Sequence, residues 1–199
     1  SMLSLCRNTV PGKAIGAAEL VQEICRYKMY FGDKGGVTVS GGEPMMQPAF
    51  VGELFSLLHG EGIHTALDTS GVWADWDGAC QVLEHTDLIL GDLKFATPEE
   101  YRLHCKADME KPLAFYRLAE ERSIPLWVRH VVVPGLNDSL EDMGKIKVLA
   151  ESFSNLEKIE WLPFHNLCVE KYQSLGIPFP LAGTDNMDEA ALQRLVDSL

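Results

Sequence analysis

Residues 37–48 read VTVSGGEPMMQP and join an apolar, β-branched run to the start of an expected helix. A turn that only reverses the chain needs one glycine and no acid, whereas this one places Gly41, Gly42 and Glu43 together before Pro44. Paired glycines let backbone N–H groups approach a ligand closely, because no Cβ intervenes. A carboxylate accepts charge-assisted hydrogen bonds from a ligand ammonium. The stretch therefore predicts a strand that ends at a ligand site.

Further β-rich runs follow this one at regular spacing, at residues 64–68 (HTALD), 88–94 (LILGDLK), 126–133 (LWVRHVVV) and 158–164 (KIEWLPF). Between and around the runs lie segments with helical periodicity. Their apolar positions are Leu20, Ile24 and Tyr27; Leu54, Phe55 and Leu58; Val82 and Leu83; Leu113, Tyr116 and Leu118; Ile146, Leu149 and Phe153; and Leu192, Leu195 and Val196.

The alternation of strands and helices predicts an α/β protein with a parallel sheet and right-handed crossovers. The runs are apolar without strict alternation, which is typical of strands covered on both faces. Five strands make an open sheet or a partial barrel, short of a closed eight-stranded barrel.

Length and composition narrow the class of protein. A chain of 199 residues with 46% hydrophobic residues can bury one substantial core, so we expect one domain or two small domains. The formal net charge of −12 argues against binding to nucleic acids or anionic membranes, because both require clustered cations. The sequence contains no apolar run of about 18 residues and no basic segment that leads into an apolar one, so we expect a cytoplasmic protein.

The five cysteines of the chain lie singly and are odd in number: Cys6, Cys25, Cys80, Cys105 and Cys168. Without a CxxC pair they indicate reduced thiols rather than a disulfide framework or a closed zinc site. We expect the last four to be small buried apolar side chains.

Polar side chains stand where the expected strands end. The ends of parallel strands open on one edge of an α/β sheet, where ligands bind. The residues concerned are Ser40 to Glu43, Asp68, Thr69, Asp92, Lys94 and His165, with Arg129 inside the fourth run. We expect Asp75, Asp138 and Ser139 to be structural caps instead.

Two of these residues leave alternatives open. A buried Arg129 requires an anionic partner, either a ligand carboxylate or a protein acid. His165, taken alone, is more readily a buried histidine with its hydrogen bonds satisfied. Together, the acids and the two cations suit a ligand with an amino-acid moiety.

The segments VTVSGGEP, HTALDTSG, LILGDLK, VRHVVVPGLND and WLPFH, in this order, resemble those of radical S-adenosylmethionine (radical SAM) enzymes that activate glycyl-radical enzymes, most closely the pyruvate formate-lyase-activating enzymes. The resemblance extends from about Cys6 to Leu199. It implies a partial barrel with about five of the six parallel β-α units of that fold. It also implies reductive cleavage of S-adenosylmethionine to a 5′-deoxyadenosyl radical, which abstracts a glycine hydrogen from a partner. The implied partners are a glycyl-radical enzyme such as pyruvate formate-lyase and an electron donor such as flavodoxin.

The same resemblance implies roles for individual residues. Lys94, Arg129 and His165 match contacts around the cofactor and are the implied catalytic residues. Asp68, Thr69 and Asp92 match residues beside the methionine carboxylate, around a monovalent cation. The implied cofactor-binding residues are Gly41, Gly42 and Glu43, which match the segment that grips the methionine amino group, with Asp68, Thr69, Asp92, Lys94 and His165.

The cysteine loop departs from the family pattern. Members carry a CxxxCxxC loop that supplies three thiolates to a 4Fe-4S cluster. Here SLCRN keeps only Cys6 as a remnant of that metal-binding motif, and Leu3 stands where the middle cysteine would be. One thiolate cannot hold such a cluster, and Cys25 or Cys105 lacks the spacing to substitute.

We therefore expect a single radical SAM domain over residues 1–199, shortened at its amino-terminal side, with a cluster-loop remnant at 2–12, β-α units over 13–199 and no cluster. Two interpretations stay open. The chain is either an activating enzyme without its redox centre, inactive as it stands, or a non-catalytic module that binds S-adenosylmethionine or the partner.

Residues 166–187 (NLCVEKYQSLGIPFPLAGTDNM) show no clear periodicity, and connections of this length are usually functional or disordered. Because they follow His165, we expect them to line a groove for the glycyl loop of the partner, with Lys171 and Tyr172 as contacts. A mobile surface loop is the alternative.

Overall fold

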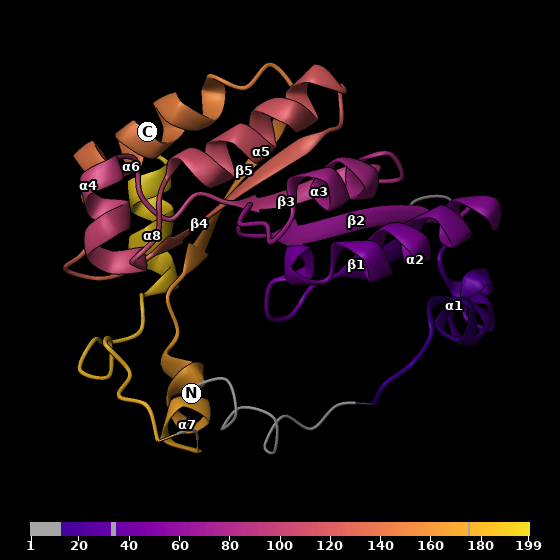
Figure 1. Cartoon of the computed structure of the whole chain (residues 1–199). Coiled ribbons are helices and arrows are strands. Elements are labelled where there is room, and N and C mark those ends of the chain that lie inside the picture. Colours follow the sequence, from indigo (N-terminus) through magenta and orange to yellow (C-terminus); the bar gives the residue numbers. More distant parts are fainter. Residues whose placement is uncertain (1–12, 33–34, 175) are drawn as a thin grey trace.

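Five parallel strands form the centre of the structure, a computed structural model that describes residues 13–32, 35–174 and 176–199. The strands are β1 (Gly36–Val39), β2 (His64–Thr69), β3 (Leu88–Asp92), β4 (Leu126–Val132) and β5 (Leu156–Pro163). They pair in chain order, so that β1 and β5 are the edges and the sheet does not close (Figure 1). The predicted α/β partial barrel is confirmed.

Helices connect the strands as expected. They are α1 (Ala17–Cys25), α2 (Pro48–Gly60), α3 (Trp76–Leu83), α4 (Pro98–Glu100), α5 (Glu110–Glu121), α6 (Leu140–Glu151), α7 (Val169–Ser174) and α8 (Glu189–Val196), with short helical turns η3 (Lys28–Tyr30), η4 (Pro44–Met46), η5 (Tyr101–Cys105) and η6 (Asn166–Cys168). Tyr27 was expected inside the first helix, but α1 ends at Cys25 and the Tyr27 side chain is 61% exposed.

The side chains of the three expected structural caps each accept a hydrogen bond from a nearby backbone N–H group. Asp75 caps α3 by accepting a hydrogen bond from Gly78 N at 2.8 Å, and Ser139 caps α6 by accepting one from Asp142 N. Asp138 caps a turn rather than a helix, because its carboxylate accepts from Gly135 N at 2.9 Å. All three predictions of a structural role are confirmed.

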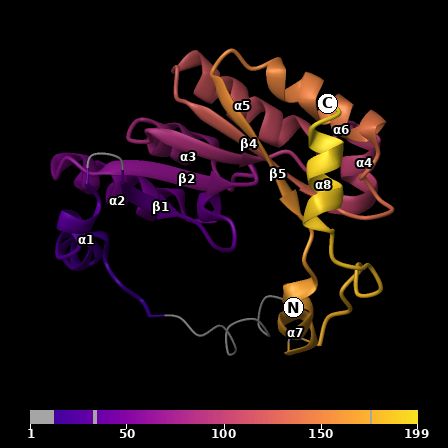
Figure 2. The ribbon, with the colours of Figure 1, turned by 180° about the vertical axis from the view of Figure 1, so that it is seen from behind.

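The main core lies between one face of the sheet and helices α2, α3, α5 and α6 (Figures 1 and 2). Burial therefore alternates along β4, which differs from the prediction that both faces are covered. In β4 the buried residues are Leu126, Val128, His130 and Val132, whereas Trp127, Arg129 and Val131 between them are more exposed. In the described part of the chain, helices pack on only one face, and the other face is free to present polar side chains.

A second core holds the carboxyl-terminal part. Val132 and Met143 pack there with Phe164 and with Leu192 of α8. The preceding residues 166–187 are not wholly irregular as predicted, because they include η6 and α7. A helix of six residues is too short to show a periodic pattern in the sequence. In both views α7 lies away from the sheet (Figures 1 and 2). Among the helices that the structure describes, none combines the length and apolar character needed to cross a bilayer.

Candidate functional site

A polar pocket of about 310 Å³ lies at the carboxyl ends of β1 to β4. Parallel strands deliver their ends to one edge of the sheet, and this edge collects the polar residues that follow each strand. The lining residues are Gly41, Gly42, Glu43, Asp68, Thr69, Ser70, Asp92, Lys94 and Arg129. The structure thus brings together most of the site residues predicted from the sequence.

The glycine loop after β1 requires glycine for its backbone. Gly41 and Gly42 have φ values of 84° and 60°, in the left-handed region that other residues rarely adopt. An added Cβ would meet no atom within 4 Å at either position, so space is not the constraint. Both residues are exposed at the pocket, which leaves their peptide groups accessible to a ligand.

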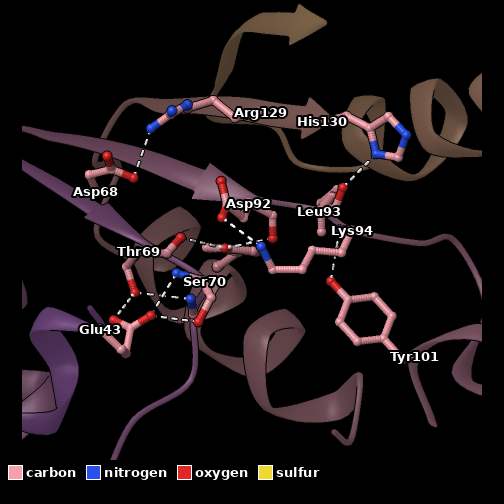
Figure 3. Close-up of polar contacts among 12 residues, drawn as sticks. Glu43, Asp68, Thr69, Ser70, Asp92, Leu93, Lys94, Tyr101, Arg129 and His130 are labelled. Carbon is pink, nitrogen blue, oxygen red and sulfur yellow. Dashed lines mark hydrogen bonds and ion pairs between the residues drawn. The ribbon is translucent and has the colours of Figure 1, made fainter. Parts of the chain in front are cut away.

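Glu43 holds this loop against the end of β2 (Figure 3). Its Oε1 accepts hydrogen bonds from Thr69 Oγ1 at 2.6 Å and from Met45 N at 3.1 Å. Its Oε2 accepts from Ser70 N at 2.8 Å and Ser70 Oγ at 2.5 Å. These donors fill the acceptor positions of the carboxylate. A ligand ammonium, the partner expected from the sequence, would have to replace one of them.

Two ion pairs cross the pocket (Figure 3). Arg129 Nη1 lies 2.8 Å from Asp68 Oδ1, with both side chains about one-quarter exposed. Lys94 Nζ lies 2.9 Å from Asp92 Oδ2. The guanidinium thus has a protein acid as its anionic partner, one of the two alternatives left open by the sequence. Three carboxylates (Glu43 among them) and two cations leave the lining with a formal charge of −1.

Two buried tyrosines fix the backbone under the acids. Tyr116 OH donates to Thr69 O at 3.3 Å and to Asp92 O at 3.1 Å. Tyr101 OH accepts from Lys94 N at 3.1 Å. Burial raises the pKa of Tyr116 well above its usual value and that of Tyr101 to about 12. Both phenols therefore stay protonated at neutral pH.

These tyrosines and Ser70 were missed in the sequence. Tyr116 reads there as one more apolar position on a helix. The available signal was that a tyrosine at a core position needs a partner for its hydroxyl. Ser70 directly follows the predicted Asp68 and Thr69, but serine is common in turns and gives no specific signal.

One of the predicted site residues that the structure describes is not brought into the pocket. His165 follows β5, and its side chain is exposed and does not line the pocket. Cys6, with residues 2–12, lies outside the described residues. Cys25, Cys80 and Cys105 are free and half-buried, less buried than expected. Within the described ranges, no group of three or more His, Cys, Asp or Glu residues could hold a metal ion.

The chain is similar to proteins of one family. The profile of the radical SAM superfamily matches residues 5–145. A pyruvate formate-lyase-activating enzyme of Clostridium pasteurianum is 35% identical over 190 residues, which cover 94% of this chain and 79% of that protein. One of Staphylococcus aureus (strain USA300) is 40% identical over 190 residues, covering 92% and 75%.

A solved structure also resembles this one. It is the crystal structure of a domain of pyruvate-formate lyase-activating enzyme from Bacteroides vulgatus ATCC 8482, with a TM-score of 0.60 and 25% identity. The likeness covers 81% of this chain and 91% of that chain. The residues matched by the superfamily profile include every residue that lines the pocket.

Proposed function

This chain belongs to the radical SAM superfamily and within it to the pyruvate formate-lyase-activating enzymes. We propose that its pocket binds S-adenosylmethionine for the generation of a glycyl radical on a partner enzyme, a reaction that also needs a 4Fe-4S cluster, which these 199 residues do not hold by themselves. The observation that carries the proposal is the pairing of two carboxylates with two cations beside an exposed glycine loop, at the edge where parallel strands end. The reaction is inferred from the family to which the chain belongs. The groups that would bind the ligand are the residues that line the pocket.

The donor set suits the amino-acid end of S-adenosylmethionine. The resemblance gives the ammonium group to the segment Gly41–Glu43, but both oxygens of Glu43 already accept hydrogen bonds from protein donors. Asp68 and Asp92 are therefore the acceptors for the ammonium group, and Lys94 and Arg129 are the donors for the carboxylate. These four side chains are already paired within the protein, so the ligand would exchange one ion pair for another rather than meet an unpaired charge. The formal charge of −1 favours a ligand with a net positive charge, and the sulfonium provides it.

In the family, a 4Fe-4S cluster supplies the electron for the reductive cleavage. The cysteines of this chain do not have the CxxxCxxC spacing, and the described residues contain no group of ligands for it. These residues therefore do not fit the cluster, and we assign them no redox step. The role of the pocket residues is to hold S-adenosylmethionine at the strand ends, where the glycyl loop of a partner can reach it.

The cysteine spacing favours a second candidate function, a module that binds S-adenosylmethionine or the partner without catalysis. The two candidates share the pocket and differ in the product. With S-adenosylmethionine, a reductant and a glycyl-radical enzyme such as pyruvate formate-lyase, an activating enzyme that holds its cluster yields a glycyl radical that electron paramagnetic resonance detects. A binding module yields none.

Calorimetric titration of S-adenosylmethionine into the protein tests the shared part of the proposal. We expect binding by the wild type and a loss of about tenfold or more in Asp92→Asn, because a charge-assisted acceptor is removed. Asp77→Asn, at an exposed acid in the first turn of α3, is the matched control and should bind like the wild type. Absence of binding by the wild type would refute the proposal.

A further inference from the structure

Behind the pocket, a buried histidine and a buried asparagine form a hydrogen-bonded pair. His130 is 1% exposed and Asn137 is 5% exposed, and neither lines the pocket. His130 Nδ1 lies 2.7 Å from Leu93 O, and Asn137 Nδ2 lies 3.1 Å from His130 Nε2. Figure 3 shows His130 on the far side of Leu93 from the ion pairs.

The partners fix the protonation of the ring. A carbonyl oxygen only accepts, so Nδ1 carries the proton and donates to Leu93 O. Nε2 is then the acceptor for the Asn137 amide. Burial lowers the pKa of His130, which favours this neutral form. Asn137 is itself anchored, because its Oδ1 accepts from Val133 N at 2.7 Å and its Nδ2 also lies 3.1 Å from Val131 O.

Leu93 stands between Asp92 and Lys94, the two residues whose side chains form one of the ion pairs of the pocket. Its own side chain is fully buried in the core. The Leu93 peptide is held on both sides by β4, because Leu93 N donates to Arg129 O at 3.0 Å and Leu93 O accepts from His130. Without the imidazole, this buried carbonyl would lose its side-chain donor.

We propose that His130 and Asn137 are positioning residues, which fix the directions of Asp92 and Lys94 at the pocket through the Leu93 carbonyl without touching the ligand. This inference rests on the proposed binding of S-adenosylmethionine. Neighbouring residues of β4 then have complementary roles: Arg129 belongs to the pocket and His130 supports the strand end beside it.

His130→Phe tests the pair most directly. Phenylalanine keeps an aromatic ring against Trp161, which meets the His130 ring edge-on at 5.5 Å between centroids, but it cannot hydrogen-bond. Asn137→Ala removes the amide that hydrogen-bonds to His130 Nε2. Thr86→Val is the matched control, because Thr86 is 6% exposed and its hydroxyl donates to a backbone carbonyl, Val82 O, outside the site.

We expect His130→Phe and Asn137→Ala each to weaken S-adenosylmethionine binding about tenfold in calorimetry, as loss of a buried hydrogen bond predicts. The double variant should lose little more, since the two residues act as one unit. The preference for S-adenosylmethionine over decarboxylated S-adenosylmethionine should also fall, because Lys94 no longer points at the carboxylate. Thr86→Val should lose stability but neither affinity nor preference.

A second measurement needs no variant and no ligand. Nitrogen-15 NMR of the wild-type histidines should show His130 neutral and protonated at Nδ1. Finding the proton at Nε2 would overturn the inference, as would a folded His130→Phe variant with wild-type affinity and preference. Absence of S-adenosylmethionine binding by the wild type would instead overturn the proposed function on which the inference rests.

Discussion

Thr69 Oγ1 donates a 2.6 Å hydrogen bond to Glu43 Oε1, and so the end of β2 holds the glycine loop that follows β1. Before the loop stands β1, a sheet edge that pairs only with β2 in the described part, and after it stand the buried Pro44 and Met45. Gly41 and Gly42 lose more conformational entropy on folding than other residues would, so ordering this loop is costly. The position of the loop therefore depends on the carboxylate of Glu43 and its donors at Thr69 and Ser70.

Replacing Glu43 by glutamine should lower the free energy of unfolding by about 1–3 kcal/mol, because an amide nitrogen replaces one acceptor oxygen and leaves protein donors unpaired. Urea unfolding measures this change. Glu53→Gln, at an exposed position on α2, is the control and should leave stability within about 0.5 kcal/mol of the wild type. Equal stability of the two variants would contradict the role assigned to Glu43.

Arg129→Met should reduce the ability of the pocket to recognise a ligand carboxylate. The wild type should bind S-adenosylmethionine about tenfold more tightly than its decarboxylated form, because charge-assisted hydrogen bonds to the carboxylate are lost in the latter. In Arg129→Met this preference should shrink, whereas Arg194→Met on α8 should keep it. Competition calorimetry gives the ratios. An unchanged ratio in Arg129→Met would show that Arg129 serves only Asp68.

The strands and the acids at their ends could be predicted from the sequence, because parallel strands alternating with helices leave a repeating pattern of apolar runs. The apolar runs ending in Asp68 and Asp92 placed both acids at one edge of a parallel sheet. The supporting contacts could not be predicted, since Tyr116 and His130 reach their partners from helix or strand positions that read only as core. The donors to Glu43 depend on side-chain directions, which spacing in the sequence does not specify.

Alkaline pH should reveal the buried phenol of Tyr101. Burial raises its pKa to about 12, from about 10 in the unfolded chain. Between these values the unfolded chain releases the proton and the folded protein keeps it. The free energy of unfolding therefore falls as pH rises through this window, by up to about 2–3 kcal/mol in total for this group.

Tyr101→Phe removes this loss. Near pH 8 the variant should be less stable than the wild type by about 1–2 kcal/mol, because Lys94 N loses its acceptor. As pH rises from about 10 to 12, the difference should shrink or reverse. Urea unfolding at both ends of the range measures it. Tyr27→Phe, at a ring that is 61% exposed, should follow the wild type throughout. A constant difference for Tyr101→Phe would contradict the assignment.

Alanine at both Lys171 and Tyr172 should weaken binding of the partner enzyme without altering S-adenosylmethionine binding. The segment follows His165 at the strand ends, and Tyr172 packs against Phe179 with ring centroids 4.9 Å apart. The Lys171 side chain lies outside what the structure describes. Surface plasmon resonance with immobilised pyruvate formate-lyase measures the affinity, and alanine at exposed Lys145 and Val148 of α6 is the control. Unchanged affinity would favour a surface loop without a binding role.

After anaerobic reconstitution with iron and sulfide, the 199-residue chain should not retain a stoichiometric 4Fe-4S cluster and should not cleave S-adenosylmethionine when reduced. Such clusters take three or four cysteine thiolates, and Cys6 alone occupies a position of the CxxxCxxC pattern. Iron and sulfide analysis tests the first half, and chromatography for 5′-deoxyadenosine tests the second. Cys6→Ala should hold as little iron as the wild type, while calorimetry on the same preparation shows that the pocket is folded. A brown protein that forms 5′-deoxyadenosine, and loses both properties in Cys6→Ala, would establish that Cys6 ligates a working cluster with thiolates from elsewhere in the chain.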